Sequence, residues 1–224
     1  MDQFLSLFRQ YDVLGAFWAN LQLTFWGAIG AFILGTLLAL MRISPVPSLR
    51  WLGTGYVHLL RNTPLTILMA VAVLGFWTQL KITLSDDFNR NFFAWAVVML
   101  VVYHAAFVCE AIRSGVNTVP LGQAEAARAI GLGFLPAARI VILPQALRGA
   151  ITPLGNTLIA LTKNTTVASV ASVAEASGLM KTMIEFDSDV ILAIFFTFAM
   201  GFVIIVIPMG LITTWASRKW AVRR

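Results

Sequence analysis

Two ionisable residues, Glu110 and Lys163, lie inside long apolar stretches of this sequence. An isolated charge at the centre of a bilayer costs at least about 2.5–3.5 kcal/mol, so such a residue is usually paired or lines a polar route. The neutral polar residues Asn164, Thr165 and Thr166 directly follow Lys163. A polar run of this kind is tolerated inside a membrane where it faces a cavity. These residues are therefore candidates for lining a solute pathway.

Each of the two charges also has a purely structural interpretation. Glu110 precedes Arg113 by one helical turn, a spacing at which the two side chains can pair, or it can serve as an interface group. Lys163 can pair with a carboxylate such as Glu110, or extend its ammonium group toward the membrane surface. On the sequence alone, the pathway and the structural interpretations both stand.

A polar, alanine-rich stretch covers residues 120–131, between two apolar blocks. Pro120 is suited to the first position of a helix, where its missing N–H costs nothing. Glu125 and Arg128 can pair on one side of this helix, and Gly131 supplies the residue that ends it. The other side would carry small and apolar residues at helical spacing: Leu121, Ala124, Ala127 and Ile130. Such a capped helix beside membrane segments is suited to being gripped by another protein.

A second short helix is expected to follow this stretch. It can begin at Pro136, and it should break near Pro144, because proline disfavours helical conformation in the residue before it.

These two segments resemble the cytoplasmic loop of permease subunits in ATP-binding-cassette importers. The resemblance rests on Glu125-Ala126-Ala127, on Gly131 and on Leu143-Pro144, which occur together at the spacing of that family. It implies that the loop couples the permease to an ATPase, through Glu125, Ala126, Ala127, Arg128 and Gly131.

Other stretches are similar to polar amino acid permeases of this family. The segment Arg61-Asn-Thr-Pro64 resembles the element that opens their second core helix, although Asn62 stands where many relatives have glycine. Residues 106–115, 153–166 and 173–175 resemble their later core helices, so the resemblance covers about residues 15–217. Segments 61–66 and 158–169 are most similar to actinobacterial glutamate permeases. Arg61 and Thr63 thereby join the candidate pathway residues.

The resemblance implies an all-α permease of the type I importer fold in the cell membrane of a bacterium. The implied partners are two cytoplasmic ATP-binding subunits, a second permease that is homologous or identical, and an extracytoplasmic amino-acid-binding protein. ATP and Mg²⁺ would be bound by the ATPase partners, so no cofactor is expected in this chain. The implied substrate is glutamate, with glutamine or a basic amino acid as the alternative.

The composition independently indicates an integral membrane protein. The 224 residues are 59% hydrophobic and 12% charged, whereas soluble domains are about half apolar and a quarter charged. The net charge of +6 would suggest nucleic-acid binding in a soluble protein, but the excess of lysine and arginine in cytoplasmic loops explains it better here.

Five transmembrane helices are predicted, at about residues 15–41, 56–80, 92–113, 151–173 and 190–215. Each is near the ~20 residues that cross a bilayer. An N-terminal segment (1–14), the coupling loop (114–148) and a basic tail (218–224) complete the chain. Asn20, Gln22 and Thr24 should turn the start of the first helix toward protein or the interface, and Gly27, Gly30 and Gly35 offer a thin face for helix packing. The fourth helix is expected to be interrupted at 163–166.

Five spans place the two termini on opposite sides of the membrane. The distribution of charged residues predicts which side is cytoplasmic. Basic residues gather on one side, namely Arg42, Arg50, Arg61, Arg113, Arg128, Arg139, Arg148, Arg218, Lys219, Arg223 and Arg224. Most acidic residues fall on the other side, namely Asp2, Asp12, Asp86, Asp87, Glu175, Glu185, Asp187 and Asp189. The basic side should be cytoplasmic, which predicts an external N-terminus and a cytoplasmic C-terminus.

Catalysis by this chain is not expected. The sequence has no phosphate-binding loop of the GxxxxGK(S/T) type, so ATP hydrolysis would belong to partner subunits. Its single cysteine, Cys109, excludes an internal disulfide, and His58 and His104 lack the spacing of metal ligands. A secondary transporter is the remaining rival, although it would leave the coupling loop unexplained. A membrane-embedded enzyme is less favoured.

Overall fold

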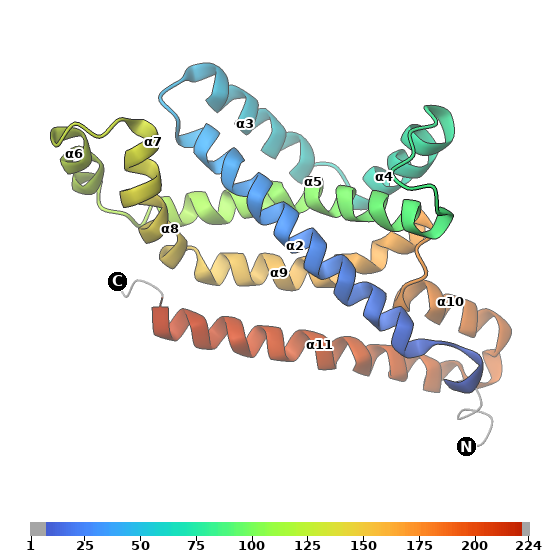
Figure 1. Cartoon of the computed structure of the whole chain (residues 1–224). Helices are drawn as coiled ribbons and strands as arrows, with labels where there is room; N and C mark the ends of the chain where they lie inside the picture. Colours follow the sequence, from blue (N-terminus) through green and yellow to red (C-terminus); the bar gives the residue numbers. More distant parts are fainter. Residues whose placement is uncertain (1–7, 221–224) are drawn as a thin grey trace. The chain divides into compact units, whose positions relative to one another are not determined.

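The structure is a computed structural model that describes residues 8–220, and every regular element in this range is helical. The predicted N-terminal segment 1–14 and basic tail 218–224 lie partly outside the described residues. In chain order the helices are α2 (Val13–Ile43), α3 (Pro47–Arg61), α4 (Leu65–Ala70), the π-helix η1 (Val71–Gln79), α5 (Phe88–Val116), α6 (Leu121–Ala129), α7 (Phe134–Ala137), the π-helix η2 (Ala138–Ile142), α8 (Leu143–Gly149), α9 (Ile151–Asn164), the 3₁₀ helix η3 (Thr165–Ala171), α10 (Ala176–Phe186), the 3₁₀ helix η4 (Ser188–Val190) and α11 (Ile191–Trp220) (Figure 1).

The chain divides into two compact units, and each is described by itself. Among described residues, unit 1 contains 8–28, 64–100 and 160–208, and unit 2 contains 29–63, 101–159 and 209–220. The division falls inside α2, α5, α9 and α11, so each of these helices contributes residues to both units.

The core of unit 1 joins the first turns of α2 to α10 and α11. Phe17 stacks on Phe198, with ring centroids 5.6 Å apart, and meets Phe202 edge to face at 5.4 Å. Buried residues of this core are Val13, Ala16, Ala176, Met183, Ile194 and Phe198. Asn20 and Thr24 are buried while Gln22 is exposed, so the expectation that the start of the first helix faces protein holds for two of the three polar residues.

Close packing of α2 on α5 organises unit 2. A Cβ added at Gly30 would collide with Val101, and one added at Gly35 would collide with Val108 and approach the carbonyl oxygen of Ala105 to 2.8 Å. The expected glycine face is therefore real at these two positions. Small residues let helices in membranes approach closely, and dispersion contacts between them then stabilise the pair.

By length and composition, α2, α5 and the segment Ser188–Trp220 are each able to cross a membrane. The count of candidate spans rises to five if two interrupted helix pairs, Pro47–Arg61 with Leu65–Gln79 and Phe134–Gly149 with Ile151–Ala171, are each one span. The first, third and fifth predicted spans thus correspond to continuous helices.

The segment predicted as a span at about 56–80 is interrupted between α3 and α4. The helix α3 ends at Arg61, and α4 begins at Leu65, after Pro64 in an extended conformation. Proline pushes the preceding residue away from helical geometry and lacks the N–H that would continue the hydrogen-bond ladder. The interruption expected at 163–166 is confirmed, because α9 ends at Asn164 and tightens into η3.

The second loop helix differs from the sequence-based expectation. It begins at Phe134 rather than Pro136, and it runs through Pro144 to Gly149 instead of breaking there. The wider π-helical turn η2 lies just before Pro144, which has no N–H to donate. The Gln145 side chain donates to the carbonyl oxygen of Val141 at 2.8 Å. The chain bends by 66° after Gly149 instead.

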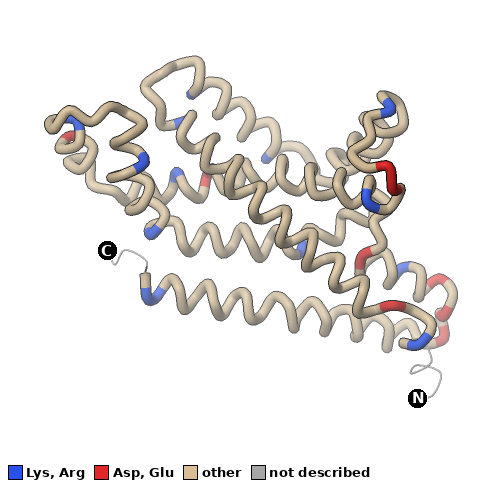
Figure 2. Tube along the Cα trace, viewed as in Figure 1, with Lys and Arg blue, Asp and Glu red and all other residues tan. Residues whose placement is uncertain are grey.

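Basic and acidic residues gather on different segments of the chain. Figure 2 shows blue basic positions along the stretch that carries α6 to α8 and at the end of α11, and red acidic positions around α10 and η4.

Candidate functional site

An ion cluster centred on Glu110 of α5 is the main charged feature of unit 2. Glu110 pairs with Arg42 of α2, with Arg113 one turn further along α5 at 3.2 Å, and with Arg61 of α3 at 3.9 Å. The Arg42 side chain is 9% exposed, whereas those of Arg61 and Arg113 are 48% and 43% exposed. Every ion pair found among the described residues involves Glu110.

This cluster holds one carboxylate against three guanidinium groups, so it retains an excess of positive charge. Arg61 also lies over the ring of Phe107, 5.7 Å from its centroid, which stabilises the cation against the aromatic face. The cluster ties α2, α3 and α5 together within unit 2. Its two half-exposed guanidinium groups can in addition attract a carboxylate from outside the cluster.

A second candidate site surrounds Lys163 in unit 1. The Lys163 side chain is exposed, and no ion pair of it is found among the described residues. It lines a pocket of about 410 Å³ together with Thr166 and with apolar residues of α11, namely Phe202, Val203, Val206 and Ile207. An ammonium group and a neighbouring hydroxyl on an apolar wall can hold one carboxylate, because an apolar setting weakens competition from water.

Residues next to Lys163 take part in a buried polar network of unit 1. The Asn20 amide donates to the Thr165 hydroxyl at 2.8 Å and to the Glu175 carboxylate at 2.9 Å, while its oxygen accepts from the Ala176 N–H at 2.9 Å. Glu175 is fully buried and also accepts from the N–H groups of Ser177 at 2.8 Å and Gly178 at 2.9 Å, so it caps α10.

The electrostatic setting of Glu175 differs from that of an exposed carboxylate. Burial raises the pKa of the Glu175 carboxyl, and the hydrogen bonds from Ser177 and Asn20 offset only part of this effect. No guanidinium group pairs with it among the described residues. Neutral donors therefore hold this carboxylate in place.

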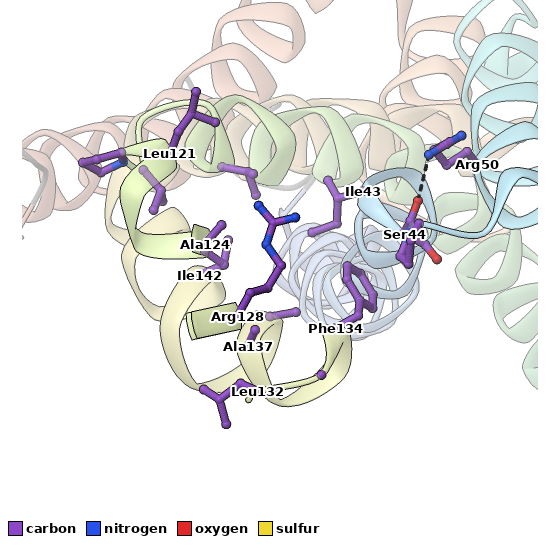
Figure 3. Close-up of a pocket in the computed structure, with 16 residues that line it drawn as sticks. Ile43, Ser44, Arg50, Leu121, Ala124, Arg128, Leu132, Phe134, Ala137 and Ile142 are labelled. Carbon is purple, nitrogen blue, oxygen red and sulfur yellow. Dashed lines mark hydrogen bonds between the residues drawn. The ribbon is translucent and has the colours of Figure 1, made fainter. Parts of the chain in front are cut away.

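The loop helix α6 presents the third candidate site. Glu125 is exposed, Ala127 is buried, and Gly131 has a φ of +85°, a conformation that favours glycine. The expected end of the helix at Gly131 is confirmed, although Pro120 precedes the first helical residue instead of occupying it. Arg128 points into a pocket beside the turn between α2 and α3 (Figure 3), and the expected pair with Glu125 is not found among the described residues.

The structure brings together some of the sequence-predicted residues. Glu110 lies beside Arg61 in unit 2, and the expected pair with Arg113 is confirmed. Thr63 donates its hydroxyl to the Leu59 carbonyl at the end of α3. Lys163 and Thr166 share a pocket in unit 1, whereas Thr165 already uses its hydroxyl in the buried network.

Sequence reasoning missed three residues that organise these sites. Arg42 appears in the sequence only as one of many basic residues, yet it lies in α2 and pairs with Glu110. The pairing of Asn20 with Glu175 has no spacing signal, because the two residues are 155 positions apart. The apolar spacing of Leu179, Met180, Met183 and Ile184 would have revealed α10.

Curated relatives match the chain along most of its length. The glutamate transport system permease protein GluC of Corynebacterium efficiens is 49% identical, over 95% of this chain and 96% of that protein. The probable glutamine ABC transporter permease protein GlnM of Bacillus subtilis is 33% identical, over 85% of this chain and 84% of that protein.

Solved structures share the fold. The structure of an amino acid ABC transporter with histidines superposes with a TM-score of 0.81 at 24% identity, covering 96% of this chain and 98% of that chain. An inward-facing structure of the MetNI methionine ABC transporter gives 0.71 at 21% identity, covering 94% of this chain and 96% of that chain. The family described as binding-protein-dependent transport system inner membrane component matches residues 16–222, and the chain belongs to this family.

Proposed function

We propose that the chain is the permease subunit of an ATP-driven importer of glutamate or a closely related polar amino acid. The observation that carries this proposal is the similarity to glutamate permeases over 95% of the chain. The excess positive charge around Glu110 and the lone ammonium group of Lys163 suit a substrate that carries carboxylates. Import of glutamine is the second candidate, because GlnM is also a relative.

The proposed membrane arrangement has five spans, an external N-terminus and a cytoplasmic C-terminus. Three continuous helices and two interrupted helix pairs provide the spans. The concentration of basic residues along the stretch with α6 to α8 favours a cytoplasmic position for that stretch.

In this arrangement the loop helix α6 couples the permease to ATP hydrolysis by partner subunits. The assembly would contain two ATPase copies, which would bind ATP and Mg²⁺ themselves. An ATPase would contact α6 through Glu125, Ala126, Ala127, Arg128 and Gly131. A second permease, identical or homologous, would complete the pore. An extracytoplasmic binding protein would deliver the amino acid to the acidic outer loops. The chain itself would catalyse no reaction.

The proposed pathway residues come from both units. In unit 2 it includes Glu110, Arg61 and Thr63, and in unit 1 it includes Lys163, Asn164, Thr165 and Thr166. The half-exposed guanidinium of Arg61 and the exposed ammonium of Lys163 support a role in contact with an anionic solute.

Reconstituted uptake tests the proposal. The permease, its ATPases and its binding protein are placed in vesicles, and ATP-dependent uptake of labelled glutamate, aspartate, glutamine and arginine is compared. We expect glutamate to be taken up fastest and only with ATP. Uptake driven by an ion gradient without ATP would instead identify a secondary transporter. Faster uptake of glutamine than of glutamate would change the assigned substrate to glutamine.

Two loop variants test the coupling role. Glu125→Lys reverses an exposed charge, and Gly131→Asp puts a side chain where φ is +85°. We expect uptake to fall steeply in both while membrane insertion survives. Unchanged uptake in both variants would remove α6 as the coupling element.

Thiol labelling tests the proposed topology. In a background with Cys109 replaced by alanine, a cysteine in place of Asp86 should react with an impermeant reagent from outside. A cysteine in place of Ser217 should react only after the membrane is opened. The opposite pattern would reverse the orientation.

A further inference from the structure

A pocket in unit 2 lies outside the proposed transport pathway and includes one proposed coupling residue, Arg128, in its lining. It has a volume of about 520 Å³, within the range of small-molecule sites. Three segments surround it: the α2–α3 turn, the residues that follow α5, and the helices α6 and α7 with η2 (Figure 3). Most of its wall is apolar, with Ile43, Phe134 and Ile142 among the larger side chains.

The charges of this pocket are of one sign. Arg50 and Arg128 line it, and its lining includes no aspartate or glutamate. Arg50 donates to the carbonyl oxygen of Ser44 at 3.3 Å, a neutral acceptor that leaves its charge uncompensated. Arg128 extends into the hollow without a carboxylate partner among the described residues (Figure 3). The pocket therefore combines two guanidinium groups with an apolar wall, which suits an amphiphilic anion.

The pocket lies beside the ends of two candidate membrane spans, and this position favours a lipid as the bound anion. Ile43 is the last residue of α2 and Val116 is the last residue of α5, and both helices are candidate membrane spans. The pocket thus lies at the ends of two candidate spans. Basic pockets between membrane helices on the cytoplasmic side are suited to anionic phospholipids.

Only some residues of α6 line the pocket. Leu121, Ala124 and Arg128 line the pocket, whereas Glu125 does not. A lipid in the pocket would therefore leave Glu125 accessible to an ATPase.

We propose that this pocket binds the headgroup of an anionic phospholipid, with Arg50 and Arg128 contacting the phosphate and Ile43, Phe134 and Ile142 contacting the glycerol and upper acyl region. Bound there, the lipid joins the α2–α3 turn to α6 within unit 2. The cytoplasmic leaflet follows from the proposed topology, but lipid binding itself requires neither glutamate nor transport.

Photolabelling of the assembled transporter tests this site. The complex of permeases and ATPases is placed in phosphatidylcholine bilayers with trace phosphatidylglycerol or trace phosphatidylcholine that carries a diazirine near its glycerol. After illumination, labelled peptides containing Ile43–Arg50 or Phe134 are quantified by mass spectrometry. We expect phosphatidylglycerol to label them more than phosphatidylcholine does. Each arginine near an anionic lipid surface contributes about fivefold in affinity, so Arg50→Gln and Arg128→Gln should each lower the labelling ratio by about that factor.

Two further sets of variants make the result specific to the pocket. Arg139→Gln removes a charge from an exposed residue of the same loop that does not line the pocket, and it should leave the ratio unchanged. Arg50→Lys and Arg128→Lys should retain most of the preference. Because Arg128 also belongs to the proposed coupling stretch, labelling and recovery of the ATPase with the permease are measured on the same sample.

Several outcomes would overturn the proposal. These are equal labelling by the two lipids, an equal loss in Arg139→Gln, abolition of labelling by inorganic phosphate, or a cross-link from the pocket to an ATPase in place of lipid. If a glutamine variant fails to assemble, competition on the unaltered protein decides: unlabelled phosphatidylglycerol must reduce the labelling more than phosphatidylcholine does. Failure of glutamate uptake alongside intact labelling would remove the substrate proposal only.

Discussion

Two buried or half-buried carboxylates in this molecule are held in opposite ways. Glu110 in unit 2 is surrounded by guanidinium groups from α2, α3 and its own helix. Glu175 in unit 1 is fully buried, and its oxygens accept hydrogen bonds from the Asn20 amide and from two backbone N–H groups. One site is organised by net charge, and the other by neutral donors.

The difference indicates different tasks. A network of neutral donors is directional and fixes one geometry, so the Asn20–Glu175 network is suited to holding α2, η3 and α10 in register. A cluster with excess cations keeps charge available to a further anion, and its half-exposed members Arg61 and Arg113 can reorient in water. We therefore expect Glu110 variants to affect stability and transport together, and Asn20 variants to affect stability first.

The largest loss of stability is expected from Glu110→Gln, which removes the only carboxylate of the cluster. Three guanidinium groups would then lie close together without a counter-charge, and breaking a buried pair in this way costs about 3–5 kcal/mol. The partial exposure of Arg61 and Arg113 favours the lower end of that range. The measurement is the midpoint of thermal unfolding of the purified complex.

A double substitution sharpens this first test. Combining Arg42→Gln with Glu110→Gln removes both partners of the most buried pair, so the double variant should be more stable than the sum of the single losses predicts. Additive losses would show that Arg42 and Glu110 contribute independently.

A smaller loss is expected from Asn20→Leu in the neutral network. The substitution removes the acceptor of the Ala176 N–H, and one unsatisfied buried group costs about 1–3 kcal/mol. The Thr165 hydroxyl and the Glu175 carboxylate each lose one hydrogen bond but keep others. Gln22→Leu is the matched control, because Gln22 lies two residues along the same helix and is exposed. Equal losses in the two variants would contradict a special role for Asn20.

A still smaller, pH-dependent effect should distinguish Glu175 from an ordinary surface carboxylate. Burial raises its pKa above the usual value of 4.5, so the folded state binds this proton more tightly than the unfolded state does. Its contribution to stability is then fully present below pH 4.5 and declines as pH rises through the folded pKa.

Comparing Glu175→Gln with the unaltered protein isolates the pH-dependent contribution of Glu175 to stability. The unfolding midpoint of the unaltered protein, relative to that of the variant, should decrease from acidic to neutral pH. Glu185→Gln on the same helix α10 is the matched control for removing a carboxylate at an exposed position. A rising difference for Glu175→Gln would reverse the assigned direction of the pKa shift.

Local patterns made much of this architecture predictable. Long apolar runs identify α2, α5 and α11, the polar run after Lys163 identifies the end of α9, and Gly131 identifies the end of α6. The sequence also identified Glu110 with Arg113, because their spacing is local.

The remaining features depend on contacts between distant residues or on backbone adjustments. Arg42 and Asn20 meet their partners across 68 and 155 positions, and neither separation has a helical signature. The passage of helix through Pro144 depends on a π-helix and on the Gln145 side chain, which propensity alone does not reveal. Polar pairing at long range is therefore where sequence reasoning was weakest.

Lys163 provides the smallest expected effect on stability and the clearest contrast with both carboxylates. It is exposed in unit 1 and lines a pocket with Thr166, and no ion pair of it is found in the part of the chain that the structure describes. Replacing an exposed side chain away from any network usually changes stability by less than about 0.5 kcal/mol. Lys163→Gln should therefore assemble normally and leave the unfolding midpoint unchanged.

Its effect on transport should nevertheless be distinct if it contacts the solute. Loss of the ammonium removes an attraction to a substrate carboxylate, so Lys163→Gln should slow glutamate uptake, while Lys163→Arg should keep the charge but lose part of the rate because guanidinium is planar and larger. ATP hydrolysis stimulated by the binding protein separates a pathway defect from an assembly defect. If Lys163→Gln transports glutamate at the original rate, the pocket on α11 is structural, and selectivity must depend on the Glu110 cluster, the second permease or the binding protein.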